Sequence, residues 1–174
     1  MTNNNSTNIA MRIAVADDTA LILQFIRELA EYEHLSDTVF ITKETILDWI
    51  SSRQIEVLIA EYEGKPAGFA LYYFNYSTFR GQKGIYLEDL FVRPEFRRHG
   101  IGTQFFHKIA QIAKSRSCFR LDWMVLDWNA NSISFYEKLG GRRVPNWIMY
   151  RLQGDELNAL ALSDTKEQRE CIDL

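Results

Sequence analysis

The sequence predicts one α/β (α+β) domain with a mixed, mostly antiparallel central sheet and helices on both of its faces. The chain has 174 residues, of which 47% are hydrophobic and 25% charged, and this balance suits a single hydrophobic core. Two strand-like runs joined by a tight turn stand in the first half of the chain. After them, helical and strand-like patterns alternate, which favours a mixed sheet.

The first half of the chain is expected to form a strand, two helices and a hairpin. A strand over residues 11–16 precedes a helix that Asp17 can cap and that ends near Glu33, with the apolar residues Ile22, Phe25, Ile26 and Leu29 on one face. A second helix is expected over residues 43–51. Strands over residues 56–62 and 68–76 flank the turn Glu63-Gly64-Lys65-Pro66, and the second of them is rich in aromatic residues.

The second half alternates strands and helices. A strand over residues 85–92 ends at Arg93-Pro94, because the residue before a proline is restricted. A helix over residues 100–117 carries isoleucine and phenylalanine at helical spacing, and a strand over residues 119–126 follows. A helix over residues 131–139 ends at Gly140-Gly141. The last expected strand covers residues 147–152.

The domain is expected to cover residues 11–163, after a disordered leader of residues 1–10 and before a polar tail of residues 164–174. The leader lacks the order of basic and apolar residues that a signal peptide has, and no apolar run approaches about 20 residues, so no membrane span is expected. Cys118 and Cys171 lie in no metal-ligand or disulfide spacing. We therefore expect a cytoplasmic protein.

The charge pattern argues against a nucleic-acid partner. The formal net charge is −3, and no basic stripe or block of like charges stands in the chain. A mildly acidic protein suits a cationic small molecule slightly better than an anionic one. The three histidines are scattered, so no metal site is expected.

The most informative segment is IYLEDLFVRPEFRRHGIGTQFF, residues 85–106. It predicts a strand, a basic loop with the pattern R-x-x-G-x-G at Arg97, Gly100 and Gly102, and the start of a helix. Glycines let backbone N–H groups approach a ligand closely, and a helix start adds unpaired N–H donors and the positive end of the helix dipole. Together these features suit a pyrophosphate. We expect a bulky residue in place of Gly102 to block that approach.

Two other interpretations of this loop must be weighed. Gly100, Gly102 and Asp122 imitate part of a dinucleotide-binding fingerprint, but Phe105 occupies the third glycine position and seven residues separate the strand from the glycines. The other interpretation is an ordinary loop that opens a helix. R-x-x-G-x-G alone does not decide against it.

The flanking segments resemble the GNAT superfamily of N-acetyltransferases, and within it the branch of diamine (spermidine/spermine) and thialysine acetyltransferases. The matching segments fall in order over most of residues 11–152 and are RELAEYEHLSD at 27–37, YYFNYSTFRG at 72–81, IYLEDLFV at 85–92, RRHGIG at 97–102 and VLDWNANSISFYEKLGG at 125–141. The resemblance implies a GNAT-like sheet, acetyl-CoA as cosubstrate, and a homodimer that pairs through its sheets and late strands.

The resemblance also implies roles for individual residues. Tyr136 would be the general acid at the sulfur, and Glu88 the base for the amine, directly or through water. Residues expected to bind acetyl-CoA, besides Tyr136, are Leu90, Phe91, Val92, Arg97, Arg98, His99, Gly100, Ile101, Gly102, Thr103, Asn129 and Ser132. Residues expected to line the amine pocket are Tyr32, Glu33, Glu88, Asp122, Trp123 and Met124.

Each of these residues also has a plain structural interpretation. Glu88 could be a solvated residue on a strand, Tyr136 could belong to the core, Asn129 could only cap a helix, and Glu33 could be surface charge. One departure from polyamine-specific relatives is that residues 142–147, Arg-Arg-Val-Pro-Asn-Trp, hold no acid. The sequence thus favours a shorter amine or amino acid over spermine. Two other functions stay open, a protein lysine or N-terminal acetyltransferase and a non-catalytic coenzyme A sensor.

Overall fold

The computed structural model describes residues 8–163 of the chain. The chain forms two compact units, one ending at Phe135 and the other beginning at Tyr136. The strands are β1 (Ile9–Ile13), β2 (Glu56–Tyr62), β3 (Lys65–Ser77), β4 (Gln82–Val92) and β5 (Leu121–Trp123). The helices are α1 (Thr19–Tyr32), α2 (Lys43–Ser51), α3 (Ile101–Ser115), α4 (Ala130–Lys138) and α5 (Gly154–Leu162). Three short 3-10 turns cover Ala16–Asp18, Ser36–Thr38 and Pro94–Phe96.

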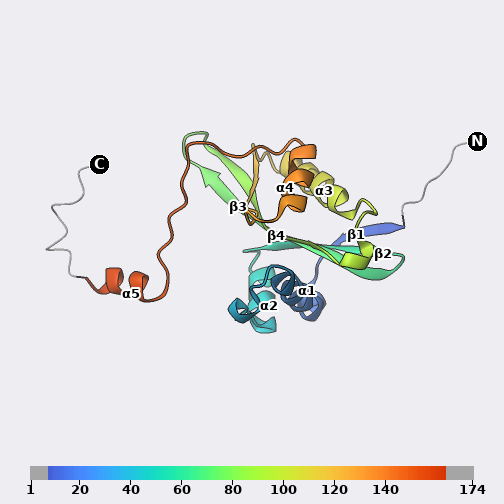
Figure 1. The fold of residues 1–174 in the computed structure, drawn as a ribbon, viewed down its shortest axis with the longest axis horizontal. Coiled ribbons are helices and arrows are strands. Elements are labelled where there is room, and N and C mark those ends of the chain that lie inside the picture. Colours follow the sequence, from blue (N-terminus) through green and yellow to red (C-terminus); the bar gives the residue numbers. More distant parts are fainter. Residues whose placement is uncertain (1–7, 164–174) are drawn as a thin grey trace, which may run out of the picture. The chain divides into compact units, whose positions relative to one another are not determined.

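The first unit is built on a five-stranded sheet in the order β1-β2-β3-β4-β5. The first four strands pair antiparallel with their neighbours, and β5 pairs parallel with β4. Figure 1 shows α1 and α2 against one face of the sheet and α3 against the other. The mixed, mostly antiparallel sheet with helices on both faces is confirmed.

Alternation along the central strands supplies a core on each face of the sheet. On the α1 and α2 face, the ring of Phe25 stacks on Phe69 with centroids 5.5 Å apart, and Phe91 lies 6.5 Å from Phe25. On the other face, Phe105 and Ile109 of α3 are fully buried. The sheet is therefore covered on both sides through β2, β3 and β4.

The beginning of the domain differs from the sequence prediction. Strand β1 begins at Ile9, so two residues of the predicted leader belong to the sheet, and residues 1–7 lie outside the described part. Asp17 does not cap α1, because the 3-10 turn Ala16–Asp18 stands before that helix. The side chain of Asp18, not that of Asp17, forms the hydrogen bonds at the start of α1.

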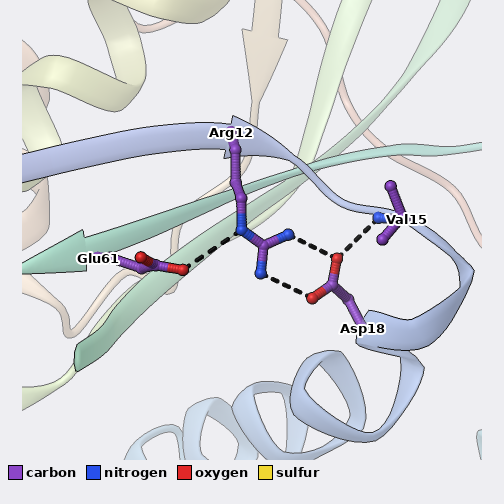
Figure 2. Close-up of polar contacts among 4 residues, drawn as sticks. All are labelled: Arg12, Val15, Asp18 and Glu61. Carbon is purple, nitrogen blue, oxygen red and sulfur yellow. Dashed lines mark hydrogen bonds and ion pairs between the residues drawn. The ribbon is translucent and has the colours of Figure 1, made fainter. Parts of the chain in front are cut away.

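Asp18 joins β1 to the start of α1 (Figure 2). Its carboxylate accepts two hydrogen bonds from the Arg12 guanidinium, at 2.7 and 2.8 Å, and one from the backbone N–H of Val15 at 2.7 Å. Arg12 also donates to Glu61 on β2 at 3.3 Å. These bonds to Arg12 lower the pKa of Asp18 against the opposing effect of burial.

The end of the chain differs most from the sequence prediction. Strand β5 covers Leu121–Trp123 rather than residues 119–126, and residues 147–152 form no strand in the described structure. A strand needs a neighbour for its backbone hydrogen bonds, and no strand lies in the described part of the second unit. The helix α5 was not predicted, and the expected tail of residues 164–174, with Cys171, lies outside the described residues.

The Asp18 network generates a prediction for stability. We expect Asp18→Asn to lower the free energy of unfolding at pH 7 by about 1 to 2 kcal/mol, because charge-assisted hydrogen bonds to Arg12 are lost. A carboxyl whose folded pKa is lowered stabilises the fold above its unfolded pKa of about 3.9, and this contribution is lost as pH falls through the folded value. The difference between variant and wild type should therefore be constant above about pH 5 and shrink below pH 4.

Urea unfolding at pH 7, 5 and 3.5 measures this difference. Asp17→Asn is the matched control, because Asp17 is exposed. If the two variants lose equal stability, the Arg12–Asp18 pair does not stabilise the fold.

Candidate active site

A β-bulge in β4 places two acidic residues side by side. Leu71 of β3 pairs with Asp89, whereas the next residue, Tyr72, pairs with Leu87, so Glu88 is an extra residue with no partner in this register. A bulge bends the strand and changes the direction in which its side chains point. Two consecutive acids in an apolar strand break the alternation expected of a half-buried strand, and this was the only sequence signal for the bulge.

Strands β4 and β5 part immediately before the bulge. Their pairing covers Ile85–Leu87 and Leu121–Trp123, whereas β4 continues to Val92. Leu90, Phe91 and Val92 pair with β3 on one side, and no strand of the described chain pairs with them on the other. These three residues are among those predicted to bind acetyl-CoA.

Two acidic side chains act on the carboxyl group of Asp89 at this point. Burial, followed by the charges of Glu88 and Glu33, raises the pKa of Asp89 to about 7. Burial raises the pKa of Glu33, which is the C-cap residue directly after α1. Tyr73 on β3 contacts Glu88, and its pKa is raised by burial first and then by the charge and a hydrogen bond of Glu88. Glu33 and Glu88 were predicted to line the amine pocket, whereas Asp89 and Tyr73 were not predicted.

The basic glycine loop lies between Val92 and α3, as predicted. Gly100 is the N-cap of α3 with φ +84°, a left-handed conformation that glycine adopts without the penalty of a Cβ atom. No side chain caps this 15-residue helix, so its first N–H groups and the positive end of its dipole are open to an anion. Arg98, Ile101 and Thr103 belong to the same loop and first turn, and Arg98 is exposed.

Two residues of this loop have contacts that the sequence did not indicate. Arg97 lies with its guanidinium 4.7 Å from the centre of the Tyr32 ring, and its Nε donates to the Val92 carbonyl at 2.9 Å. The ring of His99 lies 4.5 Å from that of Tyr62 at the end of β2. The predicted pyrophosphate contacts of these two side chains stay predictions, and both side chains also fix the loop to the sheet.

Gly102, in the first turn of α3, lies close to a side chain of α4. A Cβ atom at this position would lie 3.2 Å from Cζ of Phe135, a residue of α4. An added side chain at Gly102 would therefore crowd Phe135 unless that ring shifts by a few tenths of an ångström. The effect of a bulky residue here on the approach of a ligand stays a prediction.

Asn129 connects α4 to α1. It is buried, and its Oδ1 accepts the backbone N–H of Ser132 at 3.1 Å, so it caps α4 as its plain structural interpretation stated. The same oxygen accepts the Tyr32 hydroxyl at 3.4 Å. Trp128, which the sequence analysis did not name, lies with its ring 6.2 Å from Tyr32.

The residues expected to form the wall of the amine pocket, Asp122, Trp123 and Met124, do not share one face of the sheet. Asp122 pairs in register with Tyr86, whose ring lies 5.3 Å from Tyr73, so Asp122 shares the face of the acidic cluster. Trp123 points to the opposite face, where its ring contacts Phe106 of α3 at 5.1 Å. Met124 follows the end of β5 and is exposed. Successive strand residues alternate between faces, which explains why Trp123 lies on the face opposite Asp122.

Tyr136 lies on α4 and is half-buried. It is the first residue of the second unit, whereas Glu88 belongs to the first. Its role as general acid stays a prediction. Within residues 8–163, no group of three or more His, Cys, Asp and Glu side chains is placed to hold a metal ion, and no described helix is long and apolar enough to cross a bilayer.

Comparison with known proteins gives concordant results. The family model described as the acetyltransferase (GNAT) family matches residues 22–141. A thialysine N-epsilon-acetyltransferase from Bos taurus is 38% identical over 166 residues, which cover 88% of this chain and 97% of that protein. The structure of a Vibrio cholerae integron cassette protein superposes with a TM-score of 0.76, at 26% identity, over 90% of this chain and 99% of that one. A predicted acetyltransferase from Clostridium acetobutylicum, solved with acetyl-CoA, gives 0.70 at 18% identity over 83% and 96%.

Proposed function

Because the chain belongs to the GNAT family of acetyltransferases, we propose that it transfers the acetyl group of acetyl-CoA to a primary amine of a small cationic molecule. One observation carries this proposal: the bulge in β4 presents Glu88 and Asp89 beside Glu33, at the point where β4 leaves β5. Carboxylates attract an ammonium group and can accept its proton. The adjacent N-terminus of α3 suits the pyrophosphate of the cosubstrate.

Glu88 is proposed to make the amine nucleophilic. An alkyl ammonium has a pKa of about 10.4, so forming the free amine at pH 7 costs about 3.4 pKa units, or roughly 4.6 kcal/mol. A carboxylate within reach can take the proton directly or through one water. Asp89, with its pKa of about 7, supports Glu88 by adding negative charge as the pH rises through neutrality.

Backbone N–H groups of residues 90–92 are proposed to stabilise the oxyanion that forms on amine attack, because this stretch of β4 is not paired with β5. Tyr136 then donates a proton or a hydrogen bond to the departing thiolate. The ordinary pKa of a phenol, about 10, is close enough to that of a thiol, about 8.5, for the phenol to act as the acid. The amine attacks directly in a ternary complex, so no enzyme nucleophile is required.

The acceptor is proposed to be short. The similarity to a thialysine acetyltransferase over almost the whole chain supports a lysine analogue such as thialysine. A diamine is the next candidate, because the acidic cluster suits any ammonium group. A long polycation such as spermine would meet Arg142 and Arg143 in a loop that holds no acid.

A panel of acceptors with acetyl-CoA, read by thiol release, tests the proposal. We expect thialysine and short diamines to give a higher kcat/KM than spermine. If spermine ranks first, the acceptor assignment is wrong although the reaction class stands. If only a protein lysine or N-terminus is acetylated, or no acceptor releases thiol, the small-amine function is contradicted.

The roles of Glu88 and Tyr136 differ in their dependence on pH. Glu88→Gln impairs amine activation, so its defect should shrink as pH rises and more of the substrate arrives neutral. Tyr136→Phe should lower kcat by about 100- to 10,000-fold without such recovery and leave acetyl-CoA binding nearly intact. The two pH–rate profiles and calorimetry with acetyl-CoA measure this. If the Glu88→Gln defect stays constant up to pH 10, Glu88 binds the substrate or supports the structure and does not activate the amine. If kcat is unchanged in Tyr136→Phe, Tyr136 has no catalytic role.

We further propose a homodimer in which the segment from Trp147 to Leu152 pairs with a second copy. Trp147, Ile148 and Tyr150 are 77%, 77% and 89% exposed, and exposed apolar runs of this kind mark association surfaces. We expect light scattering at assay concentration to give twice the chain mass, and Ile148→Asp to reduce it. A wild-type monomer at that concentration contradicts the proposal.

A further inference from the structure

Tyr73, Tyr86 and Asp122 form a polar and aromatic stripe on the sheet. The stripe continues from Glu88 in the direction away from α1 and α2. The hydroxyl of Tyr73 contacts Glu88, and its ring lies 5.3 Å from that of Tyr86. Tyr86 pairs in register with Asp122 of β5. All of these side chains other than Glu88 are half-buried, and Glu88 is exposed. The core between this face and α1 and α2 is centred on Phe69, Leu71 and Phe91, so the stripe lies beyond it.

The far end of this stripe holds a cation and an anion side by side. Arg120 Nε lies 2.7 Å from Asp122 Oδ2, and the two side chains are 37% and 35% exposed. A Cβ atom at Gly84 would lie 2.8 Å from Cγ of Arg120 and 2.7 Å from Oδ1 of Asn75, so glycine is what leaves room for both side chains here.

Two buried polar atoms at this point lack a hydrogen-bond partner. Within residues 8–163, Asn75 Oδ1 and Arg120 Nε are the only buried side-chain nitrogen or oxygen atoms without a hydrogen bond, although Arg120 Nε forms an ion pair with Asp122 at 2.7 Å. An unsatisfied buried group costs free energy, and its occurrence calls for an explanation. The two atoms have complementary needs, because Nε–H requires an acceptor and Oδ1 requires a donor.

We propose that Arg120 and Asp122 recognise the amino-acid end of the acceptor, so that the preferred substrate carries an α-carboxylate and an α-ammonium group besides the amine that is acetylated. This inference rests on the proposed function. The Arg120 guanidinium binds the carboxylate through its paired N–H donors, a geometry that arginine matches better than lysine. Asp122, which is partly exposed beside Arg120, accepts the α-ammonium group.

The spacing along the sheet fits a lysine-like molecule. A strand rises about 3.3 Å per residue and neighbouring strands lie about 4.8 Å apart, so the Cα atom of Asp122, level with Tyr86, lies about 8 Å from that of Glu88. In thialysine, five bonds separate the reacting nitrogen from the α-carbon, about 6 Å when extended. The stripe of Tyr73 and Tyr86 would lie along the apolar part of the chain.

The decisive comparison uses thialysine and bis(2-aminoethyl) sulfide, which is the same molecule without the carboxylate. We expect the wild type to prefer thialysine. In Arg120→Met, kcat/KM for thialysine should fall about 10- to 100-fold, mainly through KM, because a charge-assisted bidentate contact is lost. The diamine should be acetylated as well as before or better. Asp122→Asn should instead impair both acceptors, because both carry the second ammonium group.

Arg53→Met, an exposed arginine outside the proposed site, is the matched control, and Arg120→Lys tests whether charge alone suffices. Thermal melting is measured for every variant. If Arg120→Met lowers kcat/KM equally for both acceptors and also lowers Tm, Arg120 has a structural role. If kcat/KM is unchanged for both acceptors, Arg120 does not take part in recognition. Either result overturns this inference while the proposed function stands. If the wild type acetylates neither acceptor, the proposed function itself fails.

Discussion

The parting of β4 from β5 at Leu87 is the constraint on which the site depends. Up to that residue the two strands share a ladder, and one residue later the bulge at Glu88 changes the direction of β4. The acidic side chains, the backbone of residues 90–92 and the loop that opens α3 all lie on the stretch after this point. The bulge gives up one pairing position in β4. In return, it brings two carboxyl groups together at a place where regular alternation would have separated them.

Anchors on both sides hold this stretch in place. The Arg93 guanidinium donates to the Glu28 carboxylate of α1 at 2.7 and 2.8 Å and to the Pro66 carbonyl at 2.9 Å. It also lies over the ring of Phe25. Because Arg93 directly follows β4, these contacts tie the end of the strand to both α1 and the β2–β3 hairpin. The glycine loop therefore begins from a fixed point, which is the condition for a preorganised anion site.

Elements with strong local signals could be predicted from the sequence to the residue. Helix α2 and strand β2 have the predicted bounds, because Thr42 caps the helix through the Thr45 N–H and the turn at Glu63-Gly64 ends the strand. The bounds of β5 and the absence of a strand from Trp147 to Leu152 could not be predicted, since the extent of a strand depends on distant partners. Glu88 was identified through the family resemblance. The positions of Asp89, Tyr73 and Arg120 in the site follow from a strand register and a bulge, and neither of these can be recognised in the linear sequence.

The contact of Arg97 with Tyr32 links the anion loop to the end of α1, where Glu33 stands next to Tyr32. A ligand that draws the guanidinium off the ring must first break this cation–π contact, which is worth about 0.5 to 1 kcal/mol at an exposed position. Linkage is reciprocal, so two ligands that both alter this contact would change each other's affinity through it by at most about two- to fivefold. A contact of this strength joins the loop to the end of α1 without locking either one in place.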